Sequence, residues 1–403
     1  MNIEEQVELL MQGTAYGDDA LQRTMAGELR ARLVEAEQTG RKLRVYCGYD
    51  PRKPDLHLGH TVTMRKLRQF QELGHVVFFV VGTYTSLIGD PSDQDKLRQI
   101  LTPEQADENA RTYAEQAFRI LDRTKTQVRY NAEWLAKLTF AELIQLASNF
   151  TLQQFLTREA FRQRWDRGDA IYLHETFYSL MQGYDAFTLQ ADVQVGGSDQ
   201  LFNIVTAARK VMSALGARPN VAIILGILPG TDGVVKMSKS LGNHIPISTT
   251  PEDMFGKTMS IPDGAMPVFC RLVTRWTPLQ IARFEQALSA GGLHPRDAKM
   301  QLALEICATF YGEKQAEAAQ EAFVRLFQER RLPDVMPEYQ RLAEQTILDV
   351  VVACGLAATR GDGRRLIEQH GVRLDGEILS EPLAAFPRAG VLQAGKRRFV
   401  RIL

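Results

Sequence analysis

Two short stretches, about 180 residues apart, combine residue types that bind phosphate. Residues 57–60 read His-Leu-Gly-His and open a helix expected to run to Leu73, while residues 236–240 read Lys-Met-Ser-Lys-Ser. A helix N-terminus offers unpaired N–H groups and a partial positive charge to an anion. The first stretch therefore predicts a site for a nucleotide triphosphate. The second, flanked by glycines, is expected to form a mobile cationic loop.

A third set of polar residues shares one face of a helix expected over residues 174–190. Tyr178, Gln182 and Asp185 recur at helical spacing in a segment that is otherwise apolar and aromatic. The alternative is the wet face of an amphipathic helix, but Lys, Arg and Glu are scarce after Glu175. The pattern favours a buried polar site.

A parallel sheet is expected to position these residues. Residues 44–49 have strand character and stop at Asp50, just before the helix, and residues 76–81 form a continuous apolar run. Strand, helix and strand in so few residues indicate a right-handed crossover unit. Ligands of open α/β sheets bind beyond the carboxyl ends of strands, where Asp90 and the turn Gly-Gly-Ser-Asp-Gln at 196–200 are expected. Further strands are expected at 127–130, 192–195 and 221–225.

The expected fold class is α/β, a Rossmann-like doubly wound parallel sheet with a helical insertion, followed by an α-helical domain and a small α+β domain. With 403 residues the chain is too long for one compact core. Proline and glycine signals and changes in composition suggest the boundaries. The expected segments are an N-terminal helical arm (1–43), a catalytic sheet domain (44–250) with an insertion at about 92–170, a helical domain (251–335), a linker (336–344) and a C-terminal module (345–403).

The bulk composition describes an ordinary soluble protein. Basic and acidic residues number 48 each, so no whole-molecule attraction to nucleic acid is expected and any such binding must be local. Four widely spaced cysteines suit reduced thiols in the cytoplasm. No apolar run approaches the length that spans a membrane, and no membrane association is expected.

The C-terminal module is locally basic. Residues 345–403 carry nine Lys or Arg against six Asp or Glu, and Asp375-Gly376 is a hairpin signal between short apolar stretches. Clustered basic residues favour contact with a phosphate backbone over a merely solvated face. The predicted RNA-binding residues are Arg360, Arg364, Arg365, Arg373, Lys396, Arg397 and Arg398.

The two phosphate motifs together resemble those of the class I aminoacyl-tRNA synthetases. Within that class, Tyr46-Cys47-Gly48 before Asp50-Pro51, the turn Leu-Ile-Gly-Asp-Pro-Ser at 87–92, the Tyr178, Gln182, Asp185 stripe and the 196–200 turn are similar to bacterial tyrosyl-tRNA synthetases, in the branch with Lys-Met-Ser-Lys-Ser. The resemblance spans residues 40–403. The last 60 or so residues are similar to a small RNA-binding fold shared with a ribosomal protein.

The resemblance implies a tyrosine–tRNA ligase, which forms tyrosyl-adenylate and pyrophosphate from L-tyrosine and ATP and then charges the 3′ end of tRNA(Tyr). It implies tyrosine contacts from Tyr46 and Asp185 to the phenol, from Asp90, Tyr178 and Gln182 to the ammonium group, and from Gln200 near the carboxylate. The implied catalytic residues are His57, His60, Lys236 and Lys239. The implied ATP-binding residues are Gly48, Asp50, Arg52, His57, Gly59, His60, Gly197, Asp199, Lys236, Ser238 and Lys239.

The resemblance also implies a homodimer through the insertion, an anticodon-side role for the helical domain, and Mg²⁺ that accompanies ATP without a protein-bound metal. Activation needs no general base, because the attacking carboxylate is already ionised. Alignment and cations that face the developing charge are sufficient.

Two departures from the family pattern concern the phosphate side. Arg52 stands where many relatives have Thr, which replaces a hydroxyl by a guanidinium. Asp93-Gln94-Asp95 occupy the start of the following loop, so its basic residues come only at Lys96 and Arg98. The alternatives are a tryptophanyl-tRNA synthetase, which usually has Phe in place of Tyr46 and Gln in place of Asp50, and a non-catalytic RNA-binding regulator, which would not need both phosphate motifs.

Overall fold

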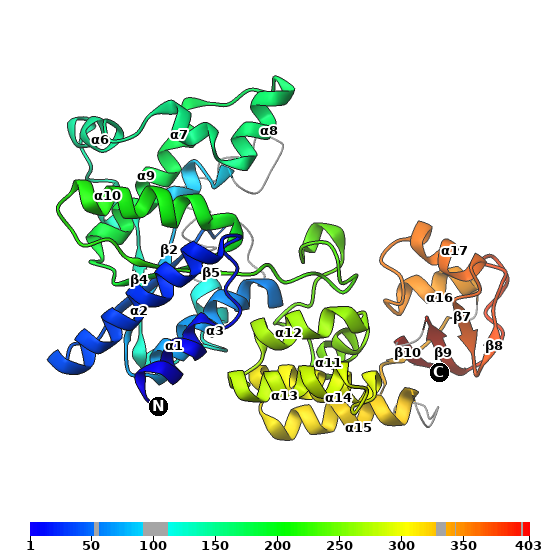
Figure 1. Ribbon diagram of the computed structural model, residues 1–403. Helices are drawn as coiled ribbons and strands as arrows, with labels where there is room; N and C mark the ends of the chain where they lie inside the picture. The colour runs from blue at the N-terminus through cyan, green and yellow to red at the C-terminus, as the bar shows by residue number, and fades with distance from the viewer. Residues whose placement is uncertain (52–55, 92–111, 328–335, 343, 396–397) are drawn as a thin grey trace. The chain divides into compact units, whose positions relative to one another are not determined.

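The computed structural model describes residues 1–51, 56–91, 112–327, 336–342, 344–395 and 398–403 (Figure 1). These residues form two compact units, Met1–Gln320 and Glu321–Leu403, and each is described by itself. No helix in the described part of the chain is long and apolar enough to cross a membrane.

The first unit is built on a five-stranded parallel sheet with the order β3-β2-β1-β4-β5. The chain adds β2 and β3 on one side of β1 and then returns to add β4 and β5 on the other. The order therefore reverses between β1 and β4, which is where ligands of open α/β sheets bind. This confirms the predicted doubly wound sheet. The strands are β1 (Arg44–Tyr49), β2 (Val76–Val81), β3 (Thr126–Tyr130), β4 (Val193–Gly197) and β5 (Val221–Leu225).

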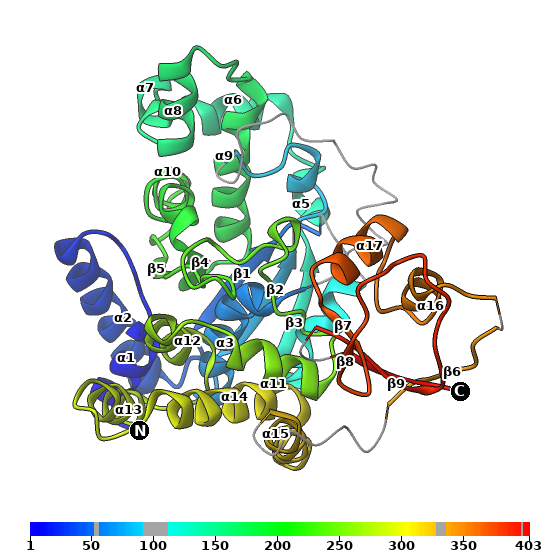
Figure 2. The same ribbon diagram turned by 90° about the vertical axis from the view of Figure 1, so that its right-hand side faces the viewer.

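Two helices carry predicted site residues. Helix α3 (Leu58–Glu72) follows β1 and lies against β1, β2 and β4, which completes the predicted strand–helix–strand unit. Helix α9 (Leu173–Thr188) packs against α10 (Arg209–Ala214) and the π-helical stretch Phe202–Ala208 (Figures 1 and 2). Gly183 allows this packing, because a Cβ there would lie 2.8 Å from the Val211 side chain.

The segment predicted as a helical insertion also supplies β3, the edge strand of the sheet. The helices that follow it are short, and two of them have Thr139 and Thr151 as N-cap residues, each in a capping box. The helix start expected at Thr102 lies outside the described residues. These helices are α5 (Ala132–Leu135), α6 (Phe140–Ala147), α7 (Leu152–Leu156) and α8 (Glu159–Arg167).

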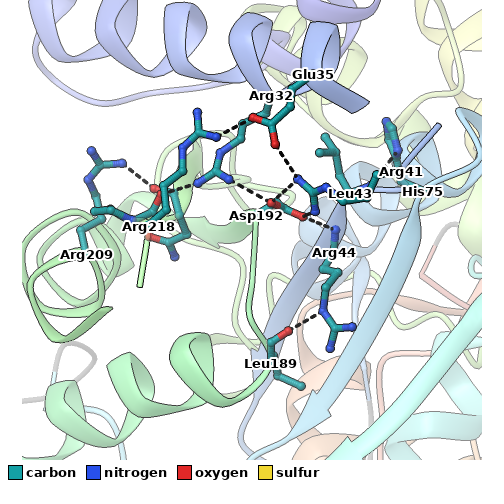
Figure 3. A network of polar contacts seen from close by, with 12 residues as sticks. Arg32, Glu35, Arg41, Leu43, Arg44, His75, Leu189, Asp192, Arg209 and Arg218 are labelled. Carbon is teal, nitrogen blue, oxygen red and sulfur yellow. Dashed lines mark hydrogen bonds and ion pairs between the residues drawn. The ribbon is translucent and has the colours of Figure 1, made fainter. Parts of the chain in front are cut away.

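The N-terminal arm is tied to the sheet by charged groups. As predicted, the arm contains two helices, α1 (Ile3–Met11) and α2 (Asp19–Thr39), and Asp18 caps the second. Figure 3 shows that Arg32 of α2 and Arg41 both reach the buried carboxylate of Asp192, at 3.1 and 2.8 Å, while the Arg44 N–H donates to it at 2.9 Å. Three donors from two elements thus satisfy one buried charge at the start of β4.

A buried lysine also links the N-terminal arm to α3. Lys66 of α3 is 4 % exposed, and its Nζ donates to the carbonyls of Leu9 and Gln12 at 2.9 and 3.1 Å, which lie at the end of α1. Burial, with a further contribution from the Arg65 charge, lowers the pKa of Lys66 to about 7.

Further helices after Thr250 belong to the first unit as far as Gln320. Proline occupies the start of four of them, a position that needs no N–H. The helices are α11 (Pro251–Met259), α12 (Met266–Val273), α13 (Pro278–Ser289), α14 (Pro295–Tyr311) and α15 (Glu313–Phe327), the last of which continues past the boundary of the unit.

The second unit combines two helices with a five-stranded sheet of order β6-β10-β9-β7-β8. The predicted hairpin at Asp375-Gly376 joins β7 to β8, and both turn residues have positive φ, 47° and 90°. The elements are β6 (Glu338–Tyr339), α16 (Ile347–Ala353), α17 (Arg360–Glu368), β7 (Val372–Leu374), β8 (Glu377–Ile378), β9 (Gly390–Ala394) and β10 (Arg398–Ile402).

Candidate active site

The end of strand β1 borders an open space. Tyr46 is fully buried and its hydroxyl donates to the Gln182 carbonyl of α9 at 3.1 Å. Gly48, two residues on, points to the same face of the sheet, and a Cβ there would meet nothing within 4 Å. Tyr49 points to the opposite face, where its hydroxyl meets Thr63 of α3 at 2.8 Å. The space next to Gly48 is therefore available to a ligand on the α9 side.

Asp185 lies buried near Tyr46 and is held by two donors. Its Oδ1 accepts from Trp134 Nε1 at 2.7 Å and its Oδ2 accepts from Asn131 Nδ2 at 3.3 Å. Burial raises the pKa of Asp185 to about 7, against the opposing effect of the two hydrogen bonds, and the Asp50 charge adds to the rise. Burial likewise raises the pKa of Tyr46. A buried tyrosine and carboxylate of this kind suit a phenol hydroxyl, which can both donate and accept.

Asp50 lies in a second cluster, which is linked to Asp185. Tyr178 donates its hydroxyl to Asp50 Oδ2 at 3.2 Å, and Thr85 donates to Oδ1 at 2.8 Å. Asn131 Nδ2 also donates to Thr85 Oγ1 at 3.1 Å, so a chain of polar contacts joins the two carboxylates. The family resemblance implies ATP binding for Asp50 and tyrosine binding for Tyr178, and the structure brings the two residues into contact.

A third carboxylate, Asp90, is paired with an arginine from the insertion. Arg158 Nη2 lies 2.5 Å from Asp90 Oδ1, and Gln200 Nε2 donates to Oδ2. Gln200 in turn accepts from Asn203 at 3.0 Å. Asp90 and Arg158 are 8 % and 5 % exposed. The predicted residues Asp90 and Gln200 therefore meet, around a cation that the sequence did not indicate.

The polar stripe of α9 is buried rather than wet. Tyr178 and Asp185 are 8 % and 3 % exposed. The side-chain Oε1 of Gln182 is buried and has no hydrogen-bond partner among the described residues. An unsatisfied buried acceptor is unusual in a folded protein and marks a place where a ligand donor would fit.

The histidine segment forms the N-terminus of α3, as predicted. His57 is the N-cap residue, its N–H donates to His60 Nδ1 at 3.2 Å, and the two rings lie 3.9 Å apart. A Cβ on Gly59 would lie 3.1 Å from the His57 ring and 3.5 Å from Met237 Cβ. The helix N-terminus and the lysine loop are therefore in close contact.

The lysine loop is anchored at both ends while its lysines are exposed. Met237 is 2 % exposed, and Ser238 N–H donates to Asn243 Oδ1 at 2.8 Å. Farther on, Ile245 O accepts from Leu58 N–H at 2.9 Å, which fixes the chain after the loop to the start of α3. Lys236, just before Met237, and Lys239, between Ser238 and Asn243, are both exposed.

Lys236 reaches the turn after β4. Its Nζ lies 3.0 Å from Asp199 Oδ2. A Cβ on Gly197 would lie 2.6 Å from Asp199 Oδ1, so glycine leaves room for this carboxylate. The structure thus gathers His57, Gly59 and His60 with the lysine loop, and joins that loop to the 196–200 turn.

Several predicted residues lie outside the described part of the chain: Arg52, the 93–95 stretch with Lys96 and Arg98, and Lys396 and Arg397. The described residues of the predicted RNA-binding set are all exposed. Arg360 pairs with Asp349 at 2.6 Å and Arg365 pairs with Asp362, so part of the positive charge is already compensated. The other described residues of the predicted RNA-binding set are Arg364, Arg373 and Arg398.

Sequence reasoning missed Thr85, Asn131, Trp134 and Arg158. Thr85 stands in the turn directly after β2, where the position relative to the sheet could have indicated it. The other three come from the segment that had no motif of its own. A single sequence carries no signal for their contacts with Asp185 and Asp90.

A family model described as "tRNA synthetases class I (W and Y)" matches residues 38–328. Among curated proteins, the tyrosine–tRNA ligase of Moorella thermoacetica is 47 % identical over 378 residues, 93 % of this chain and 91 % of the relative. That of Thermotoga maritima is 45 % identical, covering 90 % of both, and that of Desulfotalea psychrophila is 42 % identical, covering 100 % of this chain and 98 % of the relative.

Solved structures are similar in fold. A tyrosyl-tRNA synthetase from Archaeoglobus fulgidus, complexed with L-tyrosine, aligns with a TM-score of 0.61 at 23 % identity, covering 79 % of this chain and 100 % of that one. A truncated mitochondrial tyrosyl-tRNA synthetase from Aspergillus nidulans aligns with a TM-score of 0.63 at 21 % identity, covering 81 % and 94 %. At these identities the likeness concerns the fold alone.

Proposed function

The chain belongs to the class I tRNA synthetases of the tryptophan and tyrosine type and is a tyrosine–tRNA ligase, and we propose on this premise which residues carry each part of the reaction. The enzyme activates L-tyrosine with ATP to tyrosyl-adenylate and transfers tyrosine to tRNA. The observation that carries the residue assignments is the buried polar stripe of α9, with its two tethered carboxylate clusters beside the open end of β1.

Tyrosine binds along this stripe. Tyr46 and Asp185 hold the phenol, since both are buried and lie where a hydroxyl would find a donor and an acceptor. Asp90, Tyr178 and Gln182 hold the ammonium group. Gln200, hydrogen-bonded to Asp90, lies near the carboxylate. A phenylalanine would leave the phenol-binding groups unpaired, and tyrosyl-tRNA synthetases are themselves the usual illustration of that rule.

ATP enters with Mg²⁺ as the second substrate. Gly48 leaves room beside β1. Gly59 contributes backbone at the start of α3. Gly197 and Asp199 receive the adenosine, with Asp50 as a further polar group. Lys236 then leaves the Asp199 carboxylate and binds a phosphate of ATP. Lys239 and Ser238 of the same loop also approach the phosphates. Arg52 is proposed for the phosphates from its position in the sequence alone.

Catalysis follows from position and charge. The tyrosine carboxylate attacks the α-phosphate and pyrophosphate leaves, so negative charge moves toward the β- and γ-phosphates. His57, His60, Lys236 and Lys239 stabilise that charge. An exposed loop with fixed ends can make such contacts mainly in the transition state, which raises kcat rather than binding alone.

The basic residues of the second unit bind tRNA(Tyr), and the enzyme acts in the cytoplasm as a homodimer. The insertion and the start of α9 support the dimer, because they expose large apolar side chains that a monomer would leave in water. The exposed fractions are 77 % for Phe140, 56 % for Ile144, 58 % for Leu152, 62 % for Trp165 and 72 % for Leu173. Sedimentation should give the mass of two chains, and a single-chain mass at micromolar concentration would contradict the dimer.

Amino-acid-dependent ATP–pyrophosphate exchange across all twenty amino acids tests the assignment. Tyrosine should stimulate the exchange and the other nineteen should not. Stimulation by tryptophan instead would indicate the tryptophanyl alternative, and no stimulation by any amino acid would indicate the RNA-binding regulator.

A further inference from the structure

Arg158 brings a buried positive charge to the carboxylate proposed for the substrate ammonium group. It is the N-cap residue of α8, 68 positions away from Asp90 in the sequence. Its Nη2 lies 2.5 Å from Asp90 Oδ1, and its guanidinium lies over the Phe161 ring at 5.5 Å. Because both partners of the ion pair are at least nine-tenths buried, water screens their charges weakly.

The Arg158 guanidinium also has a nitrogen that does not bind Asp90. Its Nη1 is buried and has no hydrogen-bond partner among the described residues. Asp90 uses its two oxygens for Arg158 and Gln200. Each Asp90 oxygen thus accepts a hydrogen bond and can accept a further one, while the guanidinium keeps a buried donor without a partner among the described residues. A buried guanidinium of this kind favours a further negative charge nearby.

The charge balance distinguishes between possible ligands. An isolated Asp90 carboxylate would attract any ammonium group. Once Arg158 has neutralised Asp90, a plain amine adds an uncompensated positive charge to a buried site. A zwitterion brings its own carboxylate and leaves the site balanced, so burial of the ligand costs less.

We propose that Arg158 is a specificity-determining positioning residue, which restricts the tyrosine pocket to ligands with a free α-carboxylate. It orients Asp90 and raises the cost of binding an amine or an ester that lacks this group. The inference rests on the proposed role of Asp90 as the partner of the substrate ammonium group.

Equilibrium binding of L-tyrosine, tyramine and L-tyrosine methyl ester to the full-length enzyme tests the inference. The wild type should bind tyrosine at least about tenfold more tightly than either analogue. In Arg158→Met the affinity for tyrosine should fall about 10- to 100-fold while that for tyramine stays the same or rises, so the preference collapses. Arg158→Lys keeps the charge and should retain most of the preference.

Arg164→Met is the matched control. Arg164 lies on the same helix, pairs with Glu175 at 2.6 Å and also lies over Phe161, but it does not contact Asp90 in the described structure. Its loss should leave the ratio of the tyrosine and tyramine affinities unchanged.

Two results would overturn the inference: equal losses for tyrosine and tyramine in Arg158→Met, or a wild type that binds both alike. The second result needs no variant, so misfolding of Arg158→Met would not hide a failure. Asp90→Asn separates the inference from its premise. If that variant binds tyramine as well as the wild type does, the ammonium role of Asp90 is wrong; if it loses both ligands while Arg158→Met also loses both, only the role of Arg158 is wrong.

Discussion

Asp185 is one of the two residues that we propose hold the phenol. Trp134 and Asn131 fix both of its oxygens, so the carboxylate is preorganised before any ligand arrives. Burial disfavours the charged form of Asp185, and the hydrogen bonds from Trp134 and Asn131 oppose this effect. The histidines and lysines differ from it, because we propose that several of them together stabilise one developing charge.

Asp185→Ala should abolish the preference for tyrosine over phenylalanine. The substitution removes an acceptor for the phenol and leaves Trp134 Nε1 and Asn131 without their partner. The value of kcat/KM for tyrosine in pyrophosphate exchange should fall at least about 10- to 100-fold, while that for phenylalanine changes less. Asp169→Ala, which removes an exposed partner of Arg167, is the control. An unchanged ratio for the two amino acids would contradict the assignment.

Lys239→Ala should slow adenylate formation far more than it weakens tyrosine binding. Lys239 is exposed on the anchored loop, so its contact with phosphate can form late in the reaction. We expect a loss of about 100-fold or more in the single-turnover rate, with the dissociation constant for tyrosine within about twofold of the wild type. Equal effects on rate and on tyrosine binding would rule out the transition-state role.

At the scale of elements, the sequence predicted those strands whose bounds depend on local residue patterns. The bounds of β1, β2 and β5 were correct to the residue, since continuous apolar runs and flanking turn residues define buried strands. Strand β4 was predicted at 192–195 but covers Val193–Gly197, because its two glycines pair with β5 although they resemble the start of a turn.

The motif residues could likewise be placed on their elements from the sequence. The partners supplied by the insertion could not, because Arg158 and Asp90 meet only through tertiary packing. Hydrophobic periodicity contains no information about which buried cation faces which carboxylate. This is why the residues that orient the predicted site were the ones missed.

The hydrogen bonds from Lys66 of α3 to the end of α1 should make the stability of the first unit depend on pH. Lys66 has a pKa of about 7 when folded and about 10.4 when unfolded, so between these values the unfolded chain binds more protons. Stability from this group therefore rises as pH increases through that window. The free energy of unfolding of the wild type relative to Lys66→Met should rise by up to about 1.4 kcal/mol per pH unit between pH 7.5 and 9.

Urea denaturation followed by tryptophan fluorescence measures this difference. All three tryptophans, at positions 134, 165 and 276, lie in the first unit, so the signal reports its unfolding. Lys257→Met removes a partly exposed lysine and serves as the control. A difference between the wild type and Lys66→Met that does not change with pH would contradict the lowered pKa of Lys66.

At the scale of the whole molecule, the two compact units separate the residues proposed for the small-molecule substrates from those proposed for RNA. The first contains every described residue proposed for tyrosine and ATP, and the second contains the exposed arginines proposed for RNA. Because β6 pairs with β10, the second sheet begins at Glu338, before the predicted module boundary at residue 345. A clean truncation should therefore end the chain at Phe327.

The truncated enzyme should keep pyrophosphate exchange within about twofold of the wild type and lose tRNA charging by about tenfold or more, because phosphate contacts add to affinity. Arg364→Glu with Arg373→Glu in the full-length chain should reproduce the charging defect and make it less sensitive to salt. Normal charging by both proteins would disprove an RNA-binding role for the second unit.

The anchored lysine loop also offers a site for selective chemical labelling. Cys47, Cys270 and Cys307 are buried, and burial raises the pKa of each thiol, so all three should react slowly with alkylating reagents. Val234, just before the lysines, is 85 % exposed. A cysteine placed there should take up a fluorophore selectively, with the half-exposed Cys354 as the one native competitor to replace first. Once Cys354 is replaced, a single fluorophore at position 234 could therefore report the closure of the loop in each turnover.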